Sequence, residues 1–158
     1  ALEPLTRFSP DELLSLHADF MATKIAPLML PKAQQLLQQH RDAGDFLLII
    51  TATNRFVTGP IGAALQIDDL LASEPEVIDG RYTGRACGVP CFQAGKVTRL
   101  HAWLEQSGHS LEDSYFYSDS HNDIPLLQEV THPIAVDPDD ALRQHAAAQQ
   151  WPIISLRD

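Results

Sequence analysis

Apolar residues recur every three or four positions in several stretches of the chain, a spacing typical of amphipathic helices. A first helix is predicted to begin after Ser9, because Ser9 and Glu12 have the spacing of a capping box. Leu13, Leu16 and Phe20 then follow at helical spacing and are predicted to form its apolar face. Further helices are predicted over about residues 31–43, 55–65 and 96–108.

Short apolar runs lie between these helices. Residues 46–50, Phe-Leu-Leu-Ile-Ile, form an unbroken apolar run, which is typical of a strand buried on both faces of a parallel sheet. Residues 76–84 are predicted to form a hairpin with Asp79-Gly80 as its turn. The alternation of strands and helices predicts an α/β fold with a doubly wound parallel sheet. Other strands are predicted near residues 69–72, 115–118, 132–136 and 152–156.

The composition is that of a globular domain. The chain has 158 residues, of which 44% are hydrophobic and 20% charged, and its net charge is −10. This negative charge argues against nucleic acid as a partner. No apolar run has the length needed to span a membrane, and Cys87 and Cys91 are predicted to be reduced thiols. We therefore expect a cytoplasmic protein that does not bind membranes.

The predicted strand over residues 46–50 leads into Thr51, Ala52, Thr53 and Asn54. In doubly wound sheets, ligands bind beyond the carboxyl ends of the strands. A hydroxyl group and free backbone N–H groups at such an end can bind an anion. A helix cap formed by Thr53 or Asn54 is the simpler explanation of this stretch taken alone.

Lys96 stands at the start of a predicted helix, where the helix dipole disfavours a positive charge. Conflicts of this kind with local preference cluster at functional sites. Gly95 precedes it and permits the close approach of a ligand. An ordinary solvated lysine remains the simpler explanation of Lys96 taken alone.

The densest group of polar residues is Asp-Ser-His-Asn-Asp, residues 119–123, directly after a predicted strand. Carboxylates at a strand end provide oxygen ligands for a hard cation such as Mg²⁺. Asp119 is the predicted ligand, and Asp123, one helical turn later, is predicted to hold a metal-bound water or to orient a neighbouring side chain. A helix cap at Asp119 or Ser120 explains one of these residues but not the whole set, which favours a functional site.

A second acidic stretch follows another predicted strand. Residues 136–140, Val-Asp-Pro-Asp-Asp, contain an Asp-x-Asp that resembles a pair of catalytic carboxylates. We predict a helix start here instead, with Asp137 as the N-cap and Pro138 as the first helical residue.

In their order along the chain, three of these stretches resemble motifs of the haloacid dehalogenase (HAD) superfamily of phosphohydrolases. FLLIITATN with Thr51 resembles the second motif, AGKV with Lys96 the third, and YSDSHND with Asp119 and Asp123 the fourth. Sequence similarity to subfamily IB, which includes phosphoserine-phosphatase-like and histidinol-phosphatase-like members, is found in the segments DGRYTG, GKVTRLHAWL and SDSHNDIPLL. The resemblance implies a HAD-like Rossmannoid core over residues 27–158, preceded by the remnant of a helical cap over residues 1–26.

The resemblance also implies an activity and roles for the motif residues. The expected protein is a Mg²⁺-dependent phosphatase that hydrolyses a small phosphorylated metabolite, a phosphomonoester, through an aspartyl-phosphate intermediate. The implied catalytic residues are Thr51, Lys96 and Asp123, the implied metal-binding residues are Asp119 and Asp123, and the implied substrate-binding residues are Thr51, Ala52, Lys96 and Asn122. Arg55 and His121 lie close to these motifs in sequence, but a solvated arginine and a turn histidine explain them equally well.

The family's nucleophile motif, Asp-x-Asp-x-Thr after an apolar strand, has no match before Thr51. The chain begins at Ala1 and not at Met. We therefore expect part of a longer phosphatase that is inactive without the N-terminal segment of the same protein. The alternative is a pseudo-phosphatase that binds an anion or a protein partner without turnover. A response-regulator-like phosphoacceptor is a third interpretation, weakened by the order and spacing of the three motifs.

Overall fold

The structure is a computed structural model that describes residues 2–157. The chain forms two compact units, the first ending at Cys91 and the second beginning at Phe92. A cap boundary near residue 26 stays a prediction. The elements of the first unit are η1 (Glu3–Arg7), α1 (Pro10–Phe20), η2 (Met21–Ile25), η3 (Ala26–Leu28), α2 (Pro31–Ala43), β1 (Leu48–Asn54), α3 (Arg55–Ala64), β2 (Asp69–Ile78) and β3 (Arg81–Cys87).

The helix ends of the first unit follow the sequence signals. Ser9 and Glu12 form the predicted capping box at the start of α1. Gly44 ends α2 with a φ of 86°, a left-handed conformation that glycine adopts without strain. The buried face of α1 differs from the prediction, because Leu13 and His17 are buried whereas Leu16 is 51% exposed. The Nε2 atom of His17 lies 3.1 Å from the carbonyl oxygen of Val57, which satisfies this buried polar side chain.

Strand β1 differs from its prediction in both burial and extent. It begins at Leu48, and of the apolar run only Leu47 is buried, while Phe46 is 45% exposed. Among the described residues the sheet order is β1-β2-β3, so β1 is an edge strand. Its parallel pairing with β2 is regular to Ile50 and resumes only at Asn54, where four steps along β1 match two along β2. Residues 51–53 therefore bulge out of the ladder.

The hairpin of the first unit matches its prediction. Strands β2 and β3 pair antiparallel, with Val77 opposite Tyr82 and Ile78 opposite Arg81. The turn residues Asp79 and Gly80 both have positive φ, 50° and 74°, as a type I′ turn requires.

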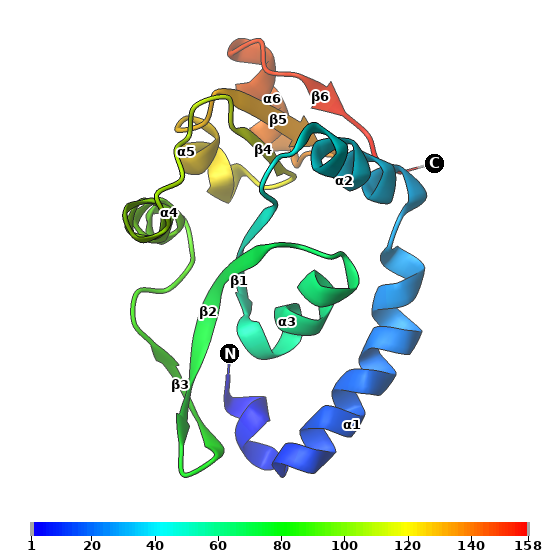
Figure 1. Cartoon of the computed structure of the whole chain (residues 1–158), viewed down its shortest axis with the longest axis vertical. Helices are drawn as coiled ribbons and strands as arrows, with labels where there is room; N and C mark the ends of the chain where they lie inside the picture. Colours follow the sequence, from blue (N-terminus) through cyan, green and yellow to red (C-terminus); the bar gives the residue numbers. More distant parts are fainter. Residues whose placement is uncertain (1, 158) are drawn as a thin grey trace. The chain divides into compact units, whose positions relative to one another are not determined.

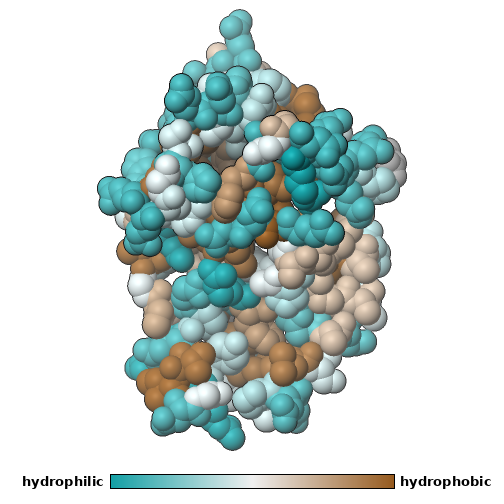
Figure 2. All heavy atoms as spheres, viewed as in Figure 1, coloured by the Kyte–Doolittle hydropathy of each residue, from teal (hydrophilic) through white to brown (hydrophobic). Residues whose placement is uncertain are grey.

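Figure 2 shows apolar side chains at the surface among polar ones. The large exposed apolar residues of the first unit include Phe8, Leu14, Leu16, Leu28, Val77 and Ile78.

The second unit is a three-stranded parallel sheet with helices (Figure 1), in the order β4-β5-β6. Its core is built from Leu127, Ala135, Leu142 and Ala146, which are fully buried, and Trp151 packs against them. The parallel pairing in both units confirms the α/β class, in two three-stranded sheets. The elements are α4 (Ala94–Ser107), β4 (Tyr115–Ser118), η4 (His121–Asp123), α5 (Ile124–Leu127), β5 (His132–Val136), α6 (Asp140–Ala148) and β6 (Ile153–Ile154).

The start of α6 corrects a prediction. Asp139, and not Asp137, is the N-cap, and its side chain accepts a hydrogen bond from the backbone of Leu142. The N–H group of Asp137 donates to the carbonyl oxygen of Ile154, which continues the β5–β6 ladder past the end of β5. Because this residue is still held by the sheet and has a φ of 43°, the helix starts later than predicted.

No single helix of residues 2–157 has the length and apolar character needed to cross a membrane. The segments Pro10–Leu28 and Pro31–Ala43 meet the length and composition criteria only when they are joined, and they are bent by 88° at the break between them.

Leu142 tests the core of the second unit. Leu142→Ala removes a fully buried side chain and is expected to lower the free energy of unfolding by about 2–5 kcal/mol. Arg143→Ala, at the exposed next position of α6, is the matched control and is expected to change it by less than about 0.5 kcal/mol. Urea unfolding followed by the fluorescence of Trp103 and Trp151, which both lie in the second unit, measures both changes, and equal effects would contradict the core assignment.

Candidate functional site

A buried ion pair joins α4 to the segment that follows β4. The Nζ atom of Lys96 lies 2.6 Å from Oδ1 of Asp123, and the two side chains are only 10% and 9% exposed. The second carboxylate oxygen, Oδ2, accepts a hydrogen bond of 2.7 Å from the Ser118 hydroxyl. The protein thus holds both oxygens of Asp123, and Asp123 in turn fixes the ammonium group of Lys96. A solvated Lys96, the simpler interpretation of the sequence, is wrong.

The residues at the start of α4 are tied to the same segment. Gln93, the N-cap of α4, has φ and ψ of 46° and −124°, an uncommon conformation for a residue other than glycine. Its side-chain amide donates to Oδ1 of Asn122 over 3.0 Å. Backbone strain of this kind persists where the surrounding contacts hold it in place, and it is common at functional sites. The N-terminus of α4 is therefore held against residues 118–123 by both Gln93 and Lys96.

The polar residues between β4 and α5 form a local network. The Ser120 hydroxyl accepts hydrogen bonds from the N–H and the side-chain amide of Asn122, at 3.3 Å and 3.2 Å. The N–H of Ser120 donates to the Ser118 hydroxyl over 3.2 Å. Ser120 thus caps the short helix η4, which was one of the two caps predicted from the sequence. It also connects Asn122 to the Ser118–Asp123 pair. One set of side chains holds the turn and the buried ion pair together.

Asp119 differs from Asp123 in its environment. It follows β4 directly and is exposed, and its carboxylate makes no hydrogen bond to any residue between 2 and 157. A free carboxylate is a suitable ligand for Mg²⁺, which takes few protein ligands and keeps several waters. Within the described residues, no three His, Cys, Asp or Glu side chains gather as a metal site. Asp119 is therefore suited to be a single protein ligand of Mg²⁺, whereas Asp123 is suited to orient the neighbouring Lys96.

Asp139 contacts the same segment, and sequence reasoning missed it. Its Oδ2 accepts a hydrogen bond of 2.9 Å from the N–H of His121 and lies 2.8 Å from Nδ1 of that residue. Its Oδ1 accepts from the N–H of Leu142 over 2.8 Å. These hydrogen bonds, first those from the His121 and Leu142 N–H groups, lower the pKa of Asp139 to about 2. The only signal in the sequence was the Asp-Pro-Asp-Asp stretch, which suggested a cap but not a contact with His121.

Thr51 belongs to the first unit and lies in the bulge of β1. Its hydroxyl accepts a hydrogen bond of 3.1 Å from the N–H of Thr53. Asn54 caps α3 by accepting from Val57 over 3.1 Å, as the simpler interpretation of this stretch expected. Arg55 pairs with Glu74, with 2.7 Å between Nε and Oε1. The meeting of Thr51 with Lys96 and Asp119 at a common site stays a prediction.

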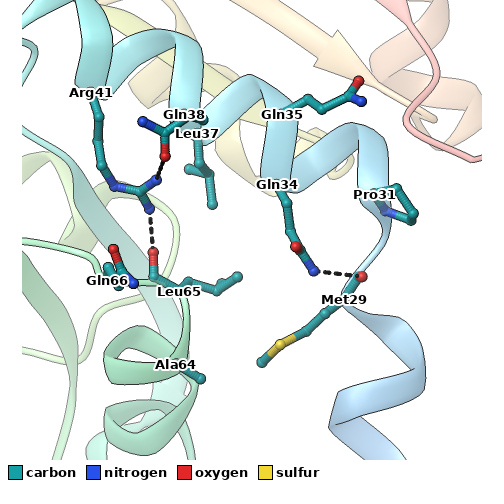
Figure 3. A pocket seen from close by; sticks show the side chains of 10 residues that line it. All are labelled: Met29, Pro31, Gln34, Gln35, Leu37, Gln38, Arg41, Ala64, Leu65 and Gln66. Atoms are coloured by element: carbon teal, nitrogen blue, oxygen red, sulfur yellow. Dashed lines mark hydrogen bonds between the residues drawn. The ribbon is translucent and has the colours of Figure 1, made fainter.

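A separate cavity of about 510 Å³ lies in the first unit between α2 and α3 (Figure 3). Gln34 donates there to the carbonyl oxygen of Met29, and Arg41 bonds to Gln38 and to the carbonyl oxygen of Leu65. None of the predicted site residues lines it, so the cavity is distinct from the predicted site. The lining residues are Met29, Pro31, Gln34, Gln35, Leu37, Gln38, Arg41, Ala64, Leu65 and Gln66.

Comparisons with known proteins agree with the motifs. Residues 2–128 match the family model of the haloacid dehalogenase-like hydrolases. A Neisseria meningitidis protein named histidinol-phosphatase is 41% identical over 99% of this chain, which spans 72% of that protein. A Mycobacterium tuberculosis protein named phosphoserine phosphatase is 32% identical over 92% of this chain, which spans only 47% of that protein.

Solved structures show the same likeness. A Bordetella pertussis protein of unknown function has a TM-score of 0.95 and 46% identity, over 99% of this chain and 71% of its own. A phosphoserine phosphatase, solved as an analogue of its phospho-aspartyl intermediate, has a TM-score of 0.62 and 21% identity, over 79% of this chain and 57% of its own. The second likeness concerns the fold alone. Together with the family match, these findings show that the chain belongs to the haloacid dehalogenase-like hydrolase family.

A double-mutant cycle tests the buried ion pair. Because Lys96→Met leaves the charge of Asp123 buried without its partner, we expect the free energy of unfolding to fall by about 3 kcal/mol or more. In the double variant Lys96→Met/Asp123→Leu neither charge remains, and much of this loss should be recovered. Urea unfolding of the wild type, both single variants and the double variant measures the coupling. Strictly additive effects would show that the two side chains do not interact.

The lowered pKa of Asp139 predicts a pH dependence of stability. The carboxyl titrates near its ordinary value of 3.8 in the unfolded chain and at about 2 in the folded protein. Its contribution to stability is therefore complete above the unfolded value and is lost as the pH falls from about 4 toward about 2. We expect the stability difference between wild type and Asp139→Asn to shrink over this range in urea unfolding experiments. A difference that stays constant from pH 5 to pH 2 would contradict the assignment.

Proposed function

We propose that this chain is the part of a Mg²⁺-dependent phosphatase that binds the phosphoryl group and the metal ion. The observation that carries the proposal is the buried pair of Lys96 and Asp123, in which Asp123 belongs to the same short segment after β4 that carries the unbonded carboxylate of Asp119. This arrangement places a fixed positive charge and a free oxygen ligand on adjoining segments. The family match and the names of the relatives support a phosphatase as the general class.

Phosphoryl transfer needs positioning and charge stabilisation more than covalent chemistry from the protein. The ammonium group of Lys96 has three N–H donors, and Asp123 accepts from one of them, so the other two would bond to phosphoryl oxygens. Thr51 would add a hydroxyl group and the backbone N–H groups of the β1 bulge. Mg²⁺ held by Asp119 would neutralise negative charge on the phosphate. The buried pair keeps Lys96 in one place, so little ordering is needed when the substrate binds.

The proposed substrate is a small phosphomonoester. The relative from Neisseria meningitidis is named histidinol-phosphatase, and it shares 41% identity with nearly the whole chain. Histidinol phosphate is therefore the first substrate to assay, and phosphoserine is the second because of the Mycobacterium tuberculosis relative. Asn122 is proposed to contact the phosphate or a metal-bound water, since its amide lies between Ser120 and Gln93.

The nucleophile is proposed to come from an N-terminal segment of the same protein. The 158 residues hold no Asp-x-Asp-x-Thr after an apolar strand, and the chain spans about half to three quarters of the relatives compared above. The carboxylate of an aspartate from that segment would attack phosphorus and displace the alcohol of the phosphomonoester, forming the aspartyl-phosphate. Water would then attack this intermediate, releasing inorganic phosphate and the free aspartate. The same lack of a nucleophile motif favours the second candidate, a pseudo-phosphatase that binds a phosphorylated ligand without turnover. The coding sequence upstream of Ala1 distinguishes the two.

Asp119→Asn tests the metal assignment in the intact protein. Asparagine keeps the size of the side chain but removes its charge, so Mg²⁺-dependent hydrolysis of histidinol phosphate is expected to fall by about 10²-fold or more. The circular dichroism spectrum and the unfolding curve should stay unchanged, because the Asp119 carboxylate makes no hydrogen bond to the described residues. Glu112→Gln, an exposed acid of the same unit, is the matched control. Equal turnover in Asp119→Asn and wild type would rule out the metal assignment.

A further inference from the structure

Asp139 is bonded to both ends of the short segment from Asp119 to His121. Its backbone N–H donates to the carbonyl oxygen of Asp119 over 2.9 Å. Its Oδ2 accepts from the N–H of His121 and lies within hydrogen-bond distance of the imidazole. A residue of the β5–α6 connection thus holds the segment that carries the proposed metal ligand, although the two lie about twenty positions apart in the sequence.

The other oxygen of Asp139 connects this segment to the core. Oδ1 caps α6 through the N–H of Leu142, and the side chains of Leu142 and Ala146 on this helix are fully buried. A helix packed in this way has few alternative positions. Asp139 therefore joins the backbone around Asp119 to α6, whose position is fixed by its packing.

The same contacts fix the backbone that carries Asp119 and hold one nitrogen of the His121 ring. The carbonyl of Asp119 is held by Asp139, and the preceding Ser118 is held by Asp123, so the backbone that directs the Asp119 carboxylate is fixed on both sides. The hydrogen bond between Nδ1 of His121 and the Asp139 carboxylate leaves Nε2 of a 54% exposed imidazole for contact with a ligand.

We propose that Asp139 is a positioning residue, which sets the direction of the Asp119 carboxylate and of the His121 ring toward the bound metal ion and substrate. The role toward the metal ion rests on the proposed function, whereas the hydrogen bonds that join Asp139 to Asp119 and His121 do not depend on it. The competing explanation is that Asp139 serves only as the helix cap of α6.

Asp139→Ser separates these two roles. Serine is as good an N-cap as aspartate, so the hydrogen bond to Leu142 and the stability of α6 should be retained. Its side chain is shorter and has a single oxygen, so it cannot also bind the N–H and the ring of His121. Ser9→Ala, which removes the cap of α1 in the first unit, is the control for the loss of a cap as such.

The first measurement is amide hydrogen exchange by NMR on this chain without metal. In Asp139→Ser the His121 N–H is expected to exchange about tenfold faster than in wild type, while the Leu142 N–H keeps its protection. Ser9→Ala should change neither rate. If His121 exchanged at the wild-type rate in Asp139→Ser, Asp139 would be a helix cap only and the proposal would be overturned.

The second measurement is Mn²⁺ binding to the intact protein by electron paramagnetic resonance, with Mn²⁺ as the probe for the Mg²⁺ site. Residues that orient a metal ligand typically contribute about 10- to 100-fold to metal affinity, so Asp139→Ser should weaken Mn²⁺ binding within that range and Ser9→Ala should not. Unchanged affinity in Asp139→Ser would also overturn the proposal. If the intact wild-type protein bound no Mn²⁺, the proposed metal site would fail, and the exchange rate of His121 would decide the role of Asp139.

Discussion

The buried pair of Lys96 and Asp123 is the interaction on which the second unit's polar site depends. Two opposite charges removed from water are tolerated only when their geometry is good and the remaining polar atoms are bonded, and the Ser118 hydroxyl meets this need at the second oxygen of Asp123. The pair fixes the N-terminus of α4 against the turn after β4. The pair gives the Lys96 ammonium group a defined position. It is not a major source of stability, because buried ion pairs contribute little compared with apolar packing.

Much of this arrangement is visible in the sequence because local signals determine it. The Ser9–Glu12 capping box, the glycine that ends α2 and the Asp79-Gly80 turn all form as predicted, since each depends on residues within a few positions. The position of Asp119 at the end of β4 was predicted for the same reason, because it depends only on the strand directly before it. Contacts between distant residues, such as the burial of Lys96 or the bond from Asp139 to His121, leave no local pattern and were not predicted.

Two predictions from local patterns were wrong. The apolar run at residues 46–50 suggested a strand buried on both faces, but Phe46 lies before β1 and is exposed, and residues 48–50 within the strand are only half-buried. Asp137 had the local sequence of an N-cap, but its hydrogen bond to Ile154 keeps it in the β5–β6 ladder. At Asp137 the pairing of strands far apart in sequence outweighs the local preference.

A crystal structure of the intact protein with Mg²⁺ and vanadate, an analogue of the transferring phosphoryl group, would test directly whether Lys96 binds the phosphoryl group and Asp119 the metal ion. We expect vanadate oxygens to be bonded to the Lys96 ammonium group and the Thr51 hydroxyl, with Mg²⁺ bound by Asp119 and the Lys96–Asp123 pair unbroken. Vanadate bound elsewhere, with Lys96 and Asp119 in contact with neither ion, would contradict this expectation.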